Sequence, residues 1–216
     1  MENRFSSLFA GLERAHGTYE IKDSRADGKL TGKAITVREN VTLQHWKDHL
    51  SGVKGLGIIP INDDSKVKFG AVDVDEYVEL NLKELSKKLE NLKLPLIPCR
   101  SKSGGVHLYL FCKDWVPAQI VKSKLEELSS TLGFGGCEVF PKDTKRYAIH
   151  SGNNLTPEQF LELAESKLLS LEEVKSLKIE VNSELKEGPP CLQILTQQGF
   201  PEGTRNNGLF NMAVYA

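Results

Sequence analysis

Alternating apolar and polar positions in the middle of the chain predict a β-α-β-β-α-β unit. Four short apolar runs bounded by turn residues are typical of strands, at residues 67–74, 94–99, 106–112 and 137–140. Leucines recur every three or four residues after the first run, and a second amphipathic segment begins at Pro117, a residue that favours the first turn of a helix. This order is that of the ferredoxin-like fold, so we predict an α+β core with the sheet order 4-1-3-2.

Strand alternation predicts which side chains share a face of that sheet. Val72 and Val74 belong to a face that the two helices cover. The opposite face is predicted to be open and to carry a polar and aromatic set: Asp73, Asp75, His107, Tyr109, Glu138 and Phe140. Because the end of the first strand lies beside the beginnings of the third and fourth, we expect the three carboxylates and the histidine to converge at one rim of the sheet.

The segment before the core has a mixed pattern. Residues 5–12 and 41–50 have apolar side chains at helical spacing and predict two helices. The polar stretch 22–34 predicts a loop, and the apolar run 55–61 is predicted to hairpin onto the first core strand. We therefore predict an N-terminal α/β subdomain of about residues 1–65.

The RRM-like core is expected to cover about residues 66–150 and the whole domain residues 1–180. Beyond the core, Thr156 and Pro157 are typical of a helix start, and a second short helix is expected over residues 170–177. The chain ends inside an unfinished apolar pattern, which predicts a truncated chain or a longer parent protein.

Composition narrows the class of protein without identifying a function. Hydrophobic residues make up 39% of the chain, charged residues 26%, and the net charge is −1, so no overall field favours nucleic acid. The four cysteines show no CxxC spacing, so we expect no zinc site and a reduced, intracellular setting. Without a signal peptide or an apolar run of bilayer length, we expect a cytoplasmic protein that does not contact membranes.

The chemistry-bearing residues fit a metal-assisted reaction at phosphorus. Asp73, Asp75 and Glu138 form the kind of oxygen cluster that Mg²⁺ prefers, and two such ions can activate one oxygen and stabilise a leaving oxygen. The nearby stretch RSKSGGVH offers a phosphate site through the backbone N–H groups of Gly104 and Gly105, with further donors and charge from neighbouring side chains: Arg100, Lys102, Ser103 and His107.

Each of these features also has a purely structural reading. Taken singly, the aspartates fit a solvated acidic turn, the glycines a hairpin turn, and His107 a hydrogen-bonded histidine of the sheet. Glu138 fits an exposed strand carboxylate, and the basic residues after it fit a solvated loop. Their joint placement at one rim of one sheet favours the functional reading.

Three of these stretches carry a family likeness. GAVDVD resembles the hydrophobic-DxD motif of archaeo-eukaryotic primases, SGGVH their serine–glycine–histidine motif, and CEVFPK their third, acidic motif. The N-terminal segments GLERAHG and HWKDHLSG are similar to primase-polymerases of phages and plasmids, so the resemblance covers roughly residues 5–165. Many relatives carry an extra segment after FPK, whereas here FPK runs directly into DTKRYAIH.

The resemblance implies a DNA primase-polymerase that makes or extends primers during replication of a mobile element. It implies that Asp73, Asp75 and Glu138 hold two Mg²⁺ or Mn²⁺ ions. It further implies nucleotide binding by Ser103, Gly104, Gly105 and His107, with Lys102 close by. Arg100 and Lys142 are further candidates for the same nucleotide site. The expected partners are NTPs or dNTPs, a single-stranded DNA template with its primer, and a helicase fused or acting in trans, in a bacterial, archaeal or infected host cell.

The resemblance also bears on the C-terminus. Residues 188–216 resemble the beginning of the helical domain that follows the catalytic core in many primases. The candidate template contacts are basic residues: Lys29, Lys33, Lys142, Lys145 and Arg146.

The residues alone are also compatible with two other functions. The same carboxylates and metals suit a nuclease that activates water, although a nuclease needs no triphosphate loop. A non-catalytic single-strand-binding module would use exposed Tyr109 and Phe140 to stack bases on the open face of the sheet.

Overall fold

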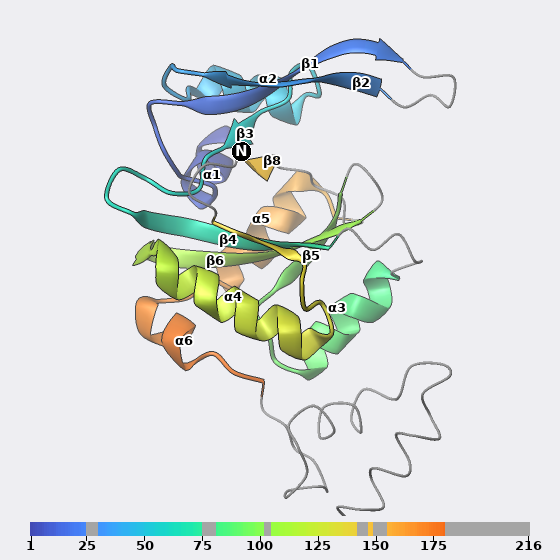
Figure 1. The fold of residues 1–216 in the computed structure, drawn as a ribbon, viewed down its shortest axis with the longest axis vertical. Coiled ribbons are helices and arrows are strands. Elements are labelled where there is room, and N and C mark those ends of the chain that lie inside the picture. Colours follow the sequence, from blue (N-terminus) through green and yellow to red (C-terminus); the bar gives the residue numbers. More distant parts are fainter. Residues whose placement is uncertain (25–29, 75–80, 102–104, 142–146, 149–154, 180–216) are drawn as a thin grey trace, which may run out of the picture.

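The predicted β-α-β-β-α-β unit forms the centre of the structure (Figure 1), a computed structural model that describes residues 1–24, 30–74, 81–101, 105–141, 147–148 and 155–179. Its elements are β4 (Lys66–Val74), α3 (Leu82–Asn91), β5 (Ile97–Arg100), β6 (Val106–Pro117), α4 (Ala118–Leu132) and β7 (Glu138–Phe140). The strands form an antiparallel sheet of order β5-β6-β4-β7. This arrangement confirms the predicted α+β class and the strand order 4-1-3-2.

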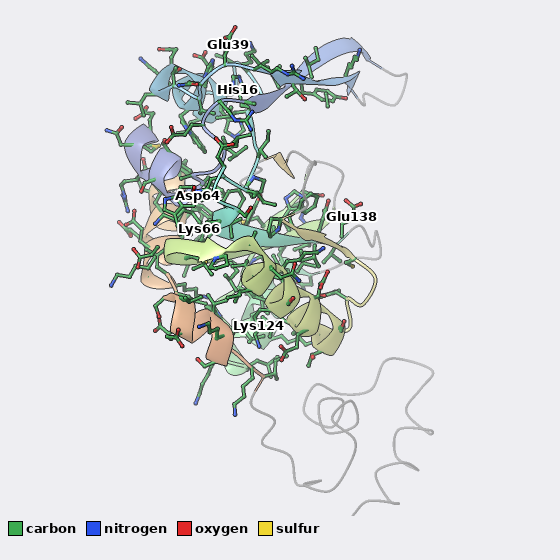
Figure 2. The ribbon with its side chains drawn as sticks, turned by 60° about the vertical axis from the view of Figure 1, so that its left-hand side comes forward. His16, Glu39, Asp64, Lys66, Lys124 and Glu138 are labelled. Atoms are coloured by element: carbon green, nitrogen blue, oxygen red, sulfur yellow. The ribbon has the colours of Figure 1, made fainter. Side chains whose placement is uncertain are left out.

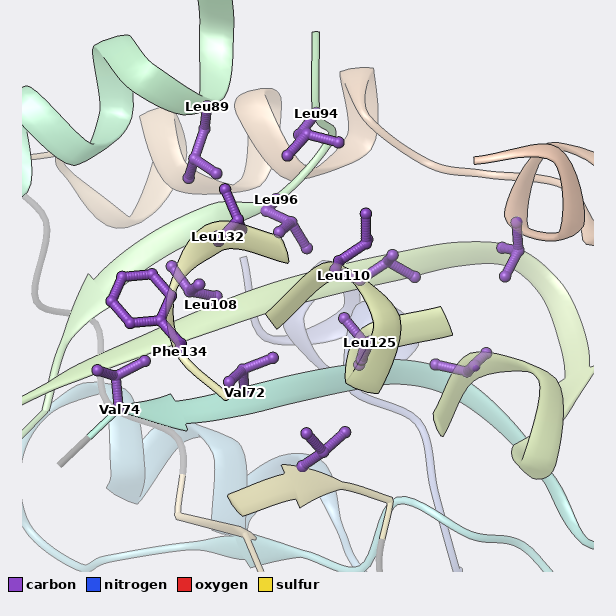
Figure 3. Close-up of a cluster of buried hydrophobic side chains, with 14 of the residues drawn as sticks. Val72, Val74, Leu89, Leu94, Leu96, Leu108, Leu110, Leu125, Leu132 and Phe134 are labelled. Carbon is purple, nitrogen blue, oxygen red and sulfur yellow. The ribbon is translucent and has the colours of Figure 1, made fainter. Parts of the chain in front are cut away.

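Helices α3 and α4 cover one face of this sheet with an aliphatic core, as predicted (Figures 1 and 3). Val72, Val74, Leu108 and Leu110 are all fully buried there. A Cβ added to Gly70 would lie 2.6 Å from Leu125 Cδ1 and 2.7 Å from Val121 Cγ1. Glycine at this position therefore lets α4 pack close against the central strand.

The other face of the sheet is buried along most of its length, which corrects the prediction of an open face. Helix α1 (Glu2–Leu8) with the following residue, Phe9, and helix α5 (Pro157–Ser166) place Phe5, Phe9 and Phe160 over it. Phe9 meets Phe69, Tyr109 and Phe111 edge-on at centroid distances of 5.1, 5.5 and 5.0 Å. Tyr109 is 0% and Phe140 3% exposed, so neither aromatic ring is available to stack a base.

A second sheet lies beyond these helices and contains most of the N-terminal part (Figure 1). Its order is β2-β1-β3-β8, built from β1 (His16–Ser24), β2 (Leu30–Val37), β3 (Gly57–Ile58) and β8 (Tyr147–Ala148). The predicted loop at 22–34 is wrong for most of its length, because β1 and β2 pair there as an antiparallel hairpin. The predicted hairpin between 55–61 and the first core strand is also wrong, because β3 pairs with β1 and β8.

Helix α2 (Leu43–Leu50) belongs to this N-terminal part. Thr42 caps it by accepting a hydrogen bond from the backbone N–H of His45, and the His45 ring accepts one from the backbone N–H of Thr42. Of its predicted apolar face, Trp46 is buried against Phe5 and Phe9, whereas Leu43 is exposed.

The remaining described elements follow the prediction closely. Thr156 caps α5 with Pro157 in the first turn, and α6 (Leu171–Ser176) follows with Ser170 as its cap. The predicted helical start at 188–216 lies outside the described residues. In the part of the chain that the structure describes, no helix has both the length and the apolar character needed to cross a membrane.

Candidate active site

Four neighbouring strands each contribute one residue to a row at one end of the sheet. Asp73 on β4 is paired in register with His107 on β6 and with Glu138 on β7, and His107 is paired with Cys99 on β5. We call these four residues the rim row. Side chains directly opposite on adjacent strands have Cβ atoms about 4.5–5.5 Å apart, so Asp73 lies between His107 and Glu138.

The next row toward the middle of the sheet has the opposite character. On each strand, the residue two positions toward the middle of the sheet belongs to this row. The four residues are Ile97, Tyr109, Ala71 and Phe140, which we call the floor row. All four are buried under the aromatic residues of α1 and α5. The Asp73 side chain, by contrast, is 22% exposed, while that of His107 is 7% exposed. On β4 and β6 the aromatic cover therefore ends between the two rows and the face becomes polar, whereas Cys99 on β5 stays in the buried cluster.

His107 connects the two rows. Its Nε2 lies 3.2 Å from Oδ1 of Asp73, and its Nδ1 lies 3.4 Å from the hydroxyl oxygen of Tyr109. The first distance is within ion-pair reach, but the contact lacks hydrogen-bond geometry, and Oδ1 of Asp73 is buried without a hydrogen-bond partner among the described residues. Burying an unsatisfied carboxylate oxygen is costly, so this atom is suited to an additional positive ligand.

The donor set at the rim row suits a hard divalent cation. Asp73 and Glu138 provide carboxylates from adjacent strands, and the unsatisfied Oδ1 of Asp73 is an oxygen of the type that Mg²⁺ and Mn²⁺ bind. The predicted third ligand, Asp75, lies outside the described residues. Within those residues, no three His, Cys, Asp or Glu side chains gather closely enough to form a complete metal site.

The predicted glycine loop is the turn between β5 and β6. The backbone N–H of Ser101 donates to the carbonyl of Gly105 at 2.8 Å and closes the turn next to the rim row. A Cβ on Gly105 would lie 2.4 Å from the carbonyl oxygen of Val74, so only glycine lets β6 begin this close to β4. Lys102, Ser103 and Gly104 lie outside the described residues.

The structure separates some of the other predicted site residues from the rim row. Arg100 is exposed and is paired with Val106, so strand alternation places it on the face of α3 and α4. Lys33 is exposed on β2, opposite Glu20. Lys29, Lys142, Lys145 and Arg146 lie outside the described residues.

The opposite end of β4 carries a different group of charges. Asp64 and Lys66 lie there, far along the sheet from Glu138 (Figure 2). A hollow of about 280 Å³ is lined there by Glu13, Asp63 and Trp115 among others, but Asp63 is already paired with Arg14 at 2.8 Å. This hollow does not contain the rim row.

Sequence reasoning placed Tyr109 on the correct face but gave it the wrong surroundings. It was expected to stack a base, whereas its ring is buried and its hydroxyl contacts His107. The available signal was the spacing of two residues between His107 and Tyr109, which puts both side chains on one face of one strand.

Comparison with known families agrees with the first two of the three motifs. Residues 18–133, more than half of the chain, match the family described as TOTE conflict system, Archaeo-Eukaryotic Primase domain. The match includes Asp73, Gly105 and His107 and stops before Glu138. Among curated proteins, the comparison finds no match for the chain. The predicted membership of the primase superfamily is thus confirmed, and the chain belongs to the archaeo-eukaryotic primase domain family of TOTE conflict systems.

Proposed function

We propose that this protein is a primase-polymerase that transfers nucleotides to a growing strand on a single-stranded DNA template, using two divalent metal ions. Its family supports nucleotidyl transfer in general terms. The finer proposal depends on one observation: the carboxylates of Asp73 and Glu138 are paired in register at the rim row, and Oδ1 of Asp73 is buried without a hydrogen bond among the described residues.

In this proposal Asp73, Asp75 and Glu138 hold the metal ions. Bound Mg²⁺ or Mn²⁺ would supply charge that favours the attacking and leaving oxygens of an in-line displacement at phosphorus. The buried floor row lies beside these carboxylates and limits the exposure of the Asp73 side chain to 22%, and charges interact more strongly where water is partly excluded.

The remaining residues orient the incoming nucleotide. His107 lies beside Asp73 and can donate a hydrogen bond to a triphosphate oxygen, and the turn closed by Ser101 and Gly105 lies at the same end of the sheet. Lys102, Ser103, Gly104 and Lys142 are proposed to complete this site, with the template reached by the basic candidates Lys29, Lys33, Lys145 and Arg146.

A nucleotide-incorporation assay tests the proposal. The full chain is given a single-stranded DNA template, with and without a primer, together with NTPs or dNTPs and either Mg²⁺ or Mn²⁺. Asp73→Asn keeps the shape of the side chain and removes its charge, so incorporation should fall by about 10²–10⁴-fold, the effect of losing several kcal/mol of transition-state stabilisation. Asp64→Asn is the matched control, because Asp64 is an exposed aspartate at the other end of β4.

The same assay separates the alternatives. Degradation of labelled DNA without added nucleotide, abolished by Asp73→Asn, would identify a nuclease instead. Nucleic-acid binding that EDTA leaves unchanged, with no turnover, would identify a binding module. The burial of Tyr109 and Phe140 already removes the exposed aromatics on which that last function depended. Incorporation by Asp73→Asn at the rate of the unmodified protein would overturn the proposal.

A further inference from the structure

We infer that Tyr109 is a positioning residue of this site: its hydroxyl donates to Nδ1 of His107 and so keeps the imidazole proton on Nε2, the nitrogen that faces Asp73. The structural part of this inference stands on the contacts of the two side chains. Its kinetic consequence rests on the proposed function.

The Tyr109 ring is held firmly enough to act in this way. It is 0% exposed and lies between Phe9, which meets it edge-on at 5.5 Å, and Phe111, which stacks on it at 5.8 Å. A buried hydroxyl needs a polar partner, and Nδ1 of His107 lies 3.4 Å from the Tyr109 hydroxyl oxygen, the distance of a long hydrogen bond. The His107 ring itself is perpendicular to the Tyr109 ring, with an interplanar angle of 86°.

The contact of the second ring nitrogen, Nε2, with Asp73 determines which group donates in this hydrogen bond. Nε2 lies 3.2 Å from Oδ1 of Asp73, and although this contact lacks hydrogen-bond geometry, a lone pair on Nε2 so close to a carboxylate oxygen would be repelled. The proton of a neutral His107 is therefore favoured on Nε2, which leaves the lone pair on Nδ1. Tyr109 must then be the donor and Nδ1 the acceptor. A phenylalanine at this position would fill the same space but would not donate to Nδ1, so it would weaken the preference for Nε2 that the contact with Asp73 also supports.

This arrangement matters for what His107 offers at the rim row. With its proton on Nε2, the ring presents a donor beside Asp73, in the rim row next to the turn that Ser101 and Gly105 close. A donor at this place suits an anionic phosphate oxygen, whereas a lone pair would repel it. Tyr109 thus acts on the nucleotide through His107, without touching it.

Histidine NMR tests the structural claim without any enzymatic turnover. The full chain is labelled with ¹⁵N at histidine and measured at about pH 8, where free imidazole is neutral, and His107→Gln identifies the His107 signals. We expect a protonated Nε2 and an unprotonated Nδ1 in the unmodified protein. In Tyr109→Phe the two signals should move toward each other as the second tautomer is populated. Tyr19→Phe, which removes a hydroxyl from β1, should leave them unchanged.

Two results would overturn the inference: a proton on Nδ1 of His107 in the unmodified protein, or signals in Tyr109→Phe identical to those of the unmodified protein. Thermal unfolding checks that Tyr109→Phe remains folded, which its unchanged ring favours. If that variant still fails to fold, the tautomer of the unmodified protein alone decides the inference.

Kinetics then test the consequence. Because His107 would bind the triphosphate alike in the ground state and the transition state, Tyr109→Phe should raise KM for the nucleotide about 3–10-fold and change kcat less than about twofold. A reduced kcat with unchanged KM would contradict this role. If the unmodified protein incorporates no nucleotide at all, the proposed function fails, while the NMR measurement still decides the role of Tyr109.

Discussion

The two faces of the central sheet are built from the same strands but differ in uniformity. On the face of α3 and α4, Val72, Val74, Leu108 and Leu110 form one aliphatic surface that continues to the end of the strands. On the other face the character changes within two residues along β4 and β6, from Ala71 and Tyr109 to Asp73 and His107. Stability of the sheet therefore depends on both faces, whereas the candidate chemistry is confined to the end of one.

This difference shows how one strand can contribute both to the stability of the sheet and to the candidate active site. Alternation lets residue 72 anchor the strand in the core while residue 73 carries a carboxylate to the rim row. The aliphatic anchors restrict the backbone, so the carboxylates of β4 and β7 are held in register by packing on the other side. The polar side chains need no rigid contacts of their own to stay side by side.

Adjacent residues on β6 test this separation most strongly. Leu108→Ala should lower the free energy of unfolding by about 2–5 kcal/mol, because it leaves a cavity in a fully buried aliphatic core. His107→Gln should lower it by at most about 1–2 kcal/mol, the value of a lost buried hydrogen bond. For nucleotide incorporation measured at low temperature, His107→Gln should instead cause the larger loss and Leu108→Ala the smaller one. Denaturant titration provides the free energies, and equal losses of stability would contradict the separation.

Gly105 lies at the start of β6, close to the backbone of β4. Its replacement should lower the free energy of unfolding by less than Leu108→Ala does. In Gly105→Ala the new methyl group meets the backbone carbonyl of Val74, which cannot rotate away, so β4 and β6 must separate locally. We expect a loss of about 1–3 kcal/mol of stability together with reduced incorporation.

The control for that change is Gly135→Ala. The nearest atoms to its added methyl group would be in Ser130 at 3.8 Å, an ordinary contact, so its effect should stay within about 0.5 kcal/mol. Similar losses of stability in both variants, measured by denaturant titration, would show that the close approach to Val74 is not the cause.

The central sheet could be predicted well from the sequence because the patterns that specify its strands lie within short segments of the chain. Period-two alternation at Val72, Val74 and Leu108 identified the helix-covered face, and the order of the elements then determined the strand order. The same alternation places Asp73, His107 and Glu138 on a common face from the sequence alone.

The wrong predictions concern segments whose partners lie far away in the sequence, or whose strands are polar or very short. The aromatic cover of Tyr109 and Phe140 comes from Phe5, Phe9 and Phe160, near opposite ends of the described chain, and no local pattern predicts that meeting. Strands β1 and β2 were missed because a polar, glycine-containing hairpin lacks apolar alternation. Strand β3 was given the wrong partner because its paired region is only two residues long.

The smallest expected effect concerns the helices that form the aromatic cover. Arg4 on α1 donates two hydrogen bonds of 2.8 Å to Glu165 on α5, and this contact lowers the pKa of Glu165 below its ordinary value of 4.5. Since both side chains are about two-fifths exposed, Glu165→Gln should lower Tm at pH 7 by only about 1–2 °C.

The pH dependence of that effect has a definite sign. A carboxyl with a lowered folded pKa stabilises the fold above its ordinary pKa, and this contribution disappears as the pH falls through the folded value. The Tm difference between Glu165→Gln and the unmodified protein should therefore vanish in acid. Glu162→Gln on the same helix is the control, and a difference that grows toward low pH would contradict the assignment.

Binding of Mn²⁺ in the absence of nucleotide tests the role of the rim row most directly. Electron paramagnetic resonance of Mn²⁺ titrated with the full chain measures the bound ion without requiring turnover. We expect binding that weakens at least about tenfold in Asp73→Asn and in Glu138→Gln, the change that about 1.4 kcal/mol produces, and that is unchanged in Asp64→Asn. Equal Mn²⁺ affinity in the unmodified protein, Asp73→Asn and Glu138→Gln would contradict the assignment of metal binding to this row.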